Sequence, residues 1–70
     1  MLPLSFADLG EEVLIRKING TPEVKRHLEN LGFNPGGTVT VLQSLNGNLI
    51  VKVKESRVAL DRTLAQKIMV

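Results

Sequence analysis

The chain has 70 residues, of which 43% are hydrophobic and 23% charged, a composition typical of a globular domain and not of a disordered chain. Its net charge is +2, with basic and acidic residues interspersed, which predicts an ordinary mixed surface. It has no cysteine, which excludes disulfides, thiolate metal sites and cysteine nucleophiles, and its only aromatic residues are two phenylalanines.

The first eighteen residues predict a helical turn followed by a strand. Their opening, MLPLSFADLG, lacks the basic and apolar segments of a secretory signal. No apolar run in the chain approaches the roughly 20 residues that cross a bilayer, so we expect a cytoplasmic protein. Ser5 is placed to cap a turn that runs through Leu9 and closes at Gly10. The segment Val13–Ile18 is rich in apolar and β-branched residues and therefore indicates a first strand.

A helix is predicted from Thr21-Pro22 onward. Thr21 can accept a hydrogen bond from a free first-turn amide, and Pro22 stands where its missing N–H costs nothing. Glu23 places negative charge at the positive end of the helix dipole. Apolar residues then recur at the spacing of one helical face: Val24, Leu28 and Leu31.

The residues after this helix predict a sharp corner. Gly32 is suited to the left-handed conformation that ends a helix, and Phe33 can fold back on the last turn. In Asn34–Gly37, Pro35 fixes the φ angle of the second turn position and Gly36 supplies positive φ at the third. These residues predict a type II turn.

The second half of the chain predicts strands joined by tight turns. From Thr38 the hydrophobic period is two, and Asn46-Gly47 indicates a type I′ hairpin. The return strand Leu49–Lys54 alternates, with three apolar residues predicted to point inward: Leu49, Val51 and Val53.

The predicted C-terminal segment adds a short strand, a helical turn and a closing strand. Glu55-Ser56 should turn the chain into the strand Arg57–Leu60. Asp61 can cap a short helix over Arg62–Gln66, and the closing strand covers Ile68–Val70.

About five short strands with one apolar face can bury that face by curling into a barrel. We therefore expect one mainly β domain over residues 1–70, a small SH3-like barrel with an inserted α-helix and short helical turns.

The chain offers little for catalysis, because one histidine and no cysteine leave no nucleophile–base pair at a supporting spacing. We therefore expect that the protein is not an enzyme and that it binds no cofactor. Glu23 and His27 stand four residues apart and could share a helical face, which leaves divalent metal binding as one alternative. Two ligands are few for a metal site, so a solvated helix face is the favoured interpretation.

Nucleic-acid binding is the other alternative. Three basic residues could line one outer surface of the barrel: Lys52, Lys54 and Arg57. RNA-binding sheets usually stack bases on aromatic side chains, and only Phe6 and Phe33 are available. The residues therefore favour a non-enzymatic binding module. We predict that its partner surface is the exposed side of the helix and its corner, with four contact residues: Lys25, Arg26, Phe33 and Asn34.

Three groups of residues resemble the ferrous iron transport protein A (FeoA) family across nearly the whole chain. The first group is Leu4, Leu9 and Gly10 with Ile18-Asn19-Gly20. The second is Leu28, Leu31, Gly32, Phe33, Pro35, Gly36, Val39 and Val41. The third is Arg57–Leu60 with Leu64, Ala65, Ile68, Met69 and Val70.

The resemblance implies an SH3-like barrel with a cytosolic accessory role in bacterial ferrous iron uptake. The implied partner is FeoB, a membrane permease with a cytosolic GTP-binding domain, which family members bind through protein contacts without carrying iron themselves. Self-association is a further interaction that we consider. Asp61 departs from the family pattern, because many relatives have a basic residue after the alanine-leucine pair.

Overall fold

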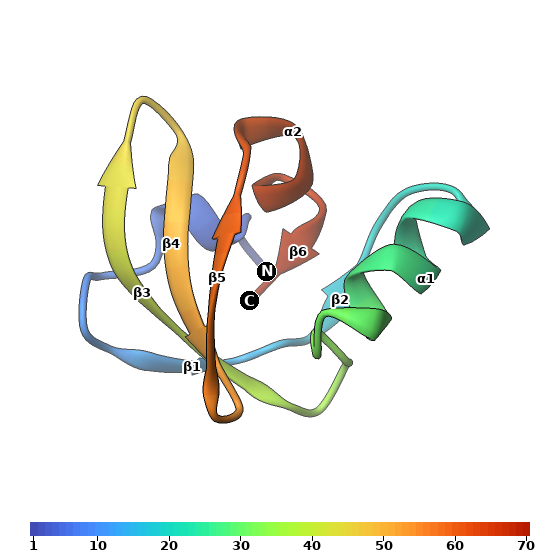
Figure 1. The fold of residues 1–70 in the computed structure, drawn as a ribbon, viewed down its shortest axis with the longest axis horizontal. Coiled ribbons are helices and arrows are strands. Elements are labelled where there is room, and N and C mark those ends of the chain that lie inside the picture. The colour runs from blue at the N-terminus through green and yellow to red at the C-terminus, as the bar shows by residue number, and fades with distance from the viewer.

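The protein is described here by a computed structural model that covers all residues 1–70 (Figure 1). Its elements in chain order are η1 Leu4–Phe6, β1 Glu12–Leu14, β2 Lys17–Ile18, α1 Pro22–Asn30, β3 Thr38–Leu45, β4 Asn48–Val53, β5 Ser56–Leu60, α2 Arg62–Ala65 and β6 Ile68–Met69. The strands form a four-stranded sheet in the order β1-β3-β4-β5 and a two-stranded sheet of β2 and β6, and every pairing is antiparallel. The mainly β architecture with one inserted helix is confirmed. None of the helices has the length and apolar character required to cross a membrane.

The predicted single strand Val13–Ile18 is two strands that belong to different sheets. β1 pairs with β3, whereas β2 pairs with β6. Between them the backbone N–H of Ile15 donates to the Gly37 carbonyl at 2.8 Å, and the Gly36 N–H donates to the Ile15 carbonyl at 2.8 Å. The prediction was wrong because the apolar-rich sequence of this run does not reveal which partner each half of the run pairs with.

The predicted N-terminal turn begins before Ser5 and ends at Phe6, not at Leu9. A 3-10 helix covers Leu4–Phe6, so Ser5 lies inside it and does not cap it. The helix forms where Leu4 is completely buried, and the Ala7 N–H closes it on the Leu4 carbonyl at 3.0 Å. Burial of the leucine, which removes apolar surface from water, sets the position of this turn.

Both predicted helix caps are confirmed. Thr21 Oγ1 accepts from the Val24 N–H at 3.2 Å, and Asp61 Oδ1 accepts from the Leu64 N–H at 2.8 Å. At the end of α1, Gly32 has a φ of +106° and the Phe33 N–H donates to the Leu28 carbonyl at 2.9 Å. This bond, which spans five residues, and the bond from the Gly32 N–H to the Glu29 carbonyl together make a Schellman motif.

The predicted turns form, with one shift in position. In the type II turn, Gly36 has a φ of +91° and the Gly37 N–H donates to the Asn34 carbonyl at 2.9 Å. Asn46 and Gly47 both have positive φ, as a type I′ turn requires. The next turn, however, begins at Lys54, which has a φ of +55° and lies outside β4.

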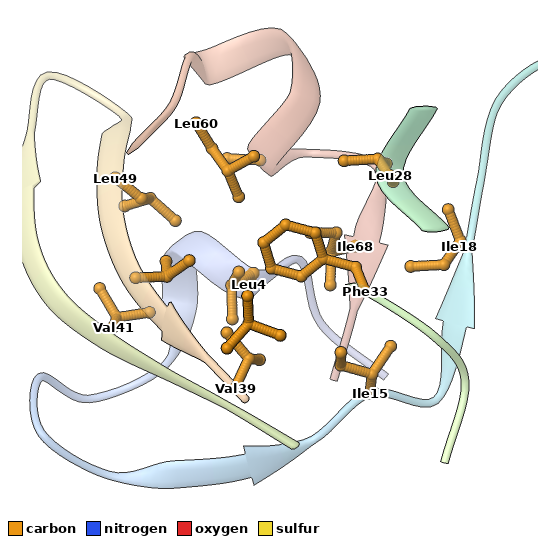
Figure 2. Close-up of a cluster of buried hydrophobic side chains, with 13 residues drawn as sticks. Leu4, Ile15, Ile18, Leu28, Phe33, Val39, Val41, Leu49, Leu60 and Ile68 are labelled. Atoms are coloured by element: carbon orange, nitrogen blue, oxygen red, sulfur yellow. The ribbon is translucent and has the colours of Figure 1, made fainter. Parts of the chain in front are cut away.

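Thirteen apolar side chains form one core between the two sheets and α1 (Figure 2). The predicted inward residues of β4 are confirmed: Leu49, Val51 and Val53 are buried. Figure 2 shows the ring of Phe33 in the middle of the labelled cluster. A domain this small has a thin core, so each of these side chains matters to its stability.

Candidate functional site

The predicted contact residues at α1 separate into exposed and buried side chains. Lys25 and Arg26 are exposed on α1, and Asn34 is half-buried. Phe33 is completely buried and has no surface to offer a partner, so its predicted outward position was wrong. The physical reason is that the Schellman motif directs Phe33 under the helix, into the space that the barrel must fill. Partner contact through Lys25, Arg26 and Asn34 stays a prediction.

The two side chains considered for metal binding lie on one turn of α1. Glu23 and His27 are both exposed, four residues apart on that helix. No group of three or more histidine, aspartate or glutamate side chains comes together in the structure. The arrangement therefore offers a metal ion the two ligands that the sequence indicated, without a third.

The basic residues considered for nucleic-acid binding lie on the far side of the four-stranded sheet from the core. Lys52 on β4 stands opposite Arg57 on β5, and both are exposed. Lys54 is separated from them in the turn that follows β4. Since Phe33 is buried, Phe6 is the one exposed aromatic side chain for stacking.

The structure has one surface hollow large enough to receive a side chain or a short segment of another molecule, and it lies at the hairpin end of the sheet. It has a volume of about 650 Å³ and spans β3, β4, the end of β5 and the loop before β1. We call it the apolar hollow, after the seven apolar residues that line it: Leu9, Leu42, Leu45, Leu49, Ile50, Ala59 and Leu60. Its other lining residues are Gln43, Ser44, Asn48 and Asp61. With one carboxylate and no basic group, this lining is suited to burying an apolar group and offers no acid–base pair.

A β-bulge explains why apolar side chains reach this surface. The register of β3 against β4 shifts between Val41 and Gln43, which leaves Leu42 as the extra residue. Without that shift, strict alternation would place Leu45 on the inner face with Val41. With it, Leu45 lies opposite Asn48 on the outer face, where it is 71% exposed.

The bulge aligns an apolar stripe across the outer face of three strands. Leu45 is a diagonal neighbour of Ile50, because it pairs with Asn48 two residues earlier in β4. Ile50 in turn stands directly opposite Ala59 on β5. Cross-strand neighbours of this kind are close enough for their side chains to form one continuous surface.

Contacts with α2 hold the hairpin next to the hollow. Arg62 Nε donates to the Asn46 carbonyl at 3.0 Å, and Arg62 Nη2 donates to the same oxygen. Asn48 Oδ1 accepts from the Arg62 N–H at 2.9 Å, which satisfies a free amide at the start of α2. The hairpin is therefore bonded to α2 through both the side chain and the backbone N–H of Arg62, which donates every one of these bonds.

The apolar hollow was not predicted from the sequence, although one signal for it was present. Leu49-Ile50-Val51 places three apolar residues in succession within an otherwise alternating strand. Strict alternation can bury only the first and third, so the middle residue must face outward. The contribution of Leu45 had no such signal, because it depends on the bulge.

Comparison with known proteins identifies the family at the level of sequence. The FeoA domain is the family whose model matches this chain, over residues 2–70. A protein of Methanocaldococcus jannaschii that carries the name Fe(2+) transport protein A is 41% identical over 70 residues, which are all of this chain and 85% of that protein.

Solved structures agree with this match. The crystal structure of an iron uptake regulatory protein, FeoA, superposes with a TM-score of 0.84 at 31% identity, covering 96% of this chain and 89% of that one. FeoA from Stenotrophomonas maltophilia in complex with zinc, a prokaryotic SH3-domain protein, gives a TM-score of 0.82 at 23% identity and covers 99% and 88% of the two chains. At that identity the second likeness concerns the fold alone, and it confirms the predicted SH3-like architecture.

Proposed function

Because the chain belongs to the FeoA family, which is involved in ferrous iron transport, we propose that it acts in the cytosol as an accessory protein that binds the permease. The partner in this proposal is the cytosolic GTP-binding domain of a FeoB-type membrane permease. The chain itself would neither cross the membrane nor carry out chemistry. Its role would be to change the state of the permease through protein contact.

The apolar hollow is the structural observation that supports a binding role. Exposed side chains of three strands and an adjoining loop gather there, and the buried core residues Leu49 and Leu60 form part of its lining. Contiguous apolar surface on a small domain is typical of sites that contact another protein. A second accessible surface is the side of α1 that carries Lys25 and Arg26, with Asn34 in the corner that follows.

Calorimetric titration of the purified chain into the cytosolic domain of the organism's own permease tests the proposal. We expect saturable binding with a negative heat-capacity change, because binding would bury apolar surface. The matching experiment in cells is ferrous iron uptake by a strain that lacks the gene, where we expect a reduced rate. Absence of binding together with normal uptake would contradict the proposed function.

A further inference from the structure

We infer that the apolar hollow is the docking site for the permease domain, and that it receives an aliphatic segment flanked by lysine or arginine. This inference rests on the proposed function and adds the surface, the chemistry of the bound segment and its orientation. It differs from the prediction made from sequence, which placed the contact on α1. The β3–β4 hairpin and α1 lie on opposite sides of the molecule (Figure 1), so one experiment can distinguish contact at the hollow from contact at α1.

The apolar character of the site comes from side chains that the fold leaves in contact with water. Leu45 is 71% exposed, Leu9 is 62% exposed and Ile50 is 38% exposed. They are contributed by β3, by the loop before β1 and by β4. A partner that covers these side chains would remove apolar surface from water, and this burial is the main favourable term in protein association. The core packing of the domain would not change.

The lining also indicates which kind of apolar segment fits. Grooves that bind proline-rich helices are lined by aromatic side chains, and none of the residues that line the hollow is aromatic. Leucine, isoleucine and alanine side chains instead pack against other aliphatic groups of similar size. The hollow is thus suited to leucine, isoleucine, valine or methionine from the partner.

Charge at the two ends of the hollow determines what should flank that segment. Asp61 lines the end at β5, and no basic residue lines the hollow anywhere. At the other end, Asp8 and Glu11 are exposed on either side of Leu9 and Gly10. Carboxylates at both ends favour a partner segment with a basic residue beyond each end of its apolar part, since complementary charge speeds encounter and sets orientation.

The hollow is held in shape before any partner arrives. The bulge in β3 sets which side chains face outward, and Arg62 fixes the hairpin through its bonds to the Asn46 carbonyl. Gly10 ties the loop that carries Leu9 to β3, because its N–H donates to the Val41 carbonyl at 2.8 Å. A surface that is already ordered loses less conformational freedom on binding.

The test is calorimetry with the permease's purified cytosolic domain against variants of the full chain. Leu45→Asp places a charge within the hollow, and we expect it to weaken binding at least tenfold. Leu9→Asp should also weaken binding. Because Leu9 lies in a separate loop, a loss of affinity in both variants could not be explained by local misfolding of the hairpin. Leu14→Asp is the matched control, because Leu14 is an exposed leucine on β1 that does not line the hollow, and it should bind like the wild type. Circular dichroism and thermal melting confirm that each variant is folded.

A second pair of variants tests the charge at the end of the hollow. Asp8→Lys combined with Glu11→Lys should weaken binding several-fold and reduce its dependence on salt. Glu23→Lys combined with Glu29→Lys changes the net charge equally, but on α1, and should have a much smaller effect.

Three outcomes would overturn the inference, and they are distinguishable. Absence of binding by the wild type would overturn this inference, and together with normal iron uptake in the deletion strain it would overturn the proposed function as well. Wild-type affinity in Leu45→Asp and Leu9→Asp, with loss of binding in Lys25→Glu combined with Arg26→Glu, would assign the contact to α1 instead. If light scattering shows a dimer that Leu45→Asp dissociates while permease binding is unchanged, the hollow binds a second copy of this chain.

Discussion

The corner after α1 (residues 32–37) and the β3–β4 hairpin are both tight turns beside apolar side chains, but they place those side chains in opposite environments. Phe33 in the corner is completely buried, whereas Leu45 beside the hairpin turn is 71% exposed. Both turns depend on residues with positive φ, Gly36 in one and Asn46-Gly47 in the other. Two turns that both use positive φ angles therefore place an apolar side chain in the core in one case and on the surface in the other.

The difference arises from what each turn is attached to. The corner is bonded to the backbone of Ile15 through Gly36 and Gly37, so it closes the barrel around Phe33. The hairpin extends beyond the part of β3 that pairs with β1, and its bonds run to α2. We conclude that the corner contributes to stability and that the hairpin is available for binding.

Removing the buried ring should have the largest effect. Phe33→Ala deletes the central side chain of the core and is expected to lower the free energy of unfolding by about 3–5 kcal/mol. That is a large part of the roughly 5–15 kcal/mol that stabilises a typical domain. Urea denaturation followed by circular dichroism measures it. A loss below about 1 kcal/mol would show that the corner does not support the core.

Alanine substitutions at Gly36 in the corner and at Gly47 in the hairpin allow the loss of stability in the two regions to be compared directly. Gly36→Ala meets no atom within 4 Å and should cost about 1–2 kcal/mol, from its positive φ alone. Gly47→Ala has a similar φ, but its Cβ would lie 2.6 Å from Arg62 Nε. Displacing that side chain loses its bonds to the Asn46 carbonyl, so the cost should be larger by about 1 kcal/mol. Equal losses in denaturation experiments would mean that Arg62 does not hold the hairpin.

Removing a helix-capping group should destabilise only the part of the molecule around that helix. Asn48→Ala deletes the acceptor for the Arg62 N–H, and Thr21→Ala deletes the acceptor for the Val24 N–H. Each should cost about 1 kcal/mol. Hydrogen exchange by NMR should become faster at the hairpin and α2 in the first variant, and in α1 in the second. Faster exchange throughout the domain in either variant would contradict the independence of the two regions.

The smallest effect on stability is expected at the exposed leucine. Leu45→Ala removes little buried surface and should change the free energy of unfolding by less than about 0.5 kcal/mol. The same substitution should still weaken permease binding in the calorimetric assay. A loss of stability comparable to that of Phe33→Ala would show that Leu45 belongs to the core.

Local features of the fold could be read from the sequence because they depend on neighbouring residues. Thr21 and Asp61 cap their helices through bonds that span three residues, and Pro35-Gly36 makes its turn within four. The inward residues of β4 follow from alternation along one strand. The family resemblance rests on the same features and is confirmed by the match over residues 2–70.

The candidate site could not be predicted in this way, because its residues are not all neighbours in the sequence. Lys25 and Arg26 were placed correctly on the surface of α1, but the apolar hollow combines residues from strands and a loop that are distant in the chain. Of those residues, only Ile50 was marked by its position within an alternating strand.

The sequence by itself thus determined α1 and α2 with their caps, the turns at Pro35-Gly36 and Asn46-Gly47, and the inner face of β4, since each depends on bonds or spacing within a few residues. Only the tertiary structure decided that Val13–Ile18 divides between two sheets and that Leu45 is exposed. These outcomes depend on which strands pair and in which register, and a single extra residue in β3 reverses the face of every side chain after it.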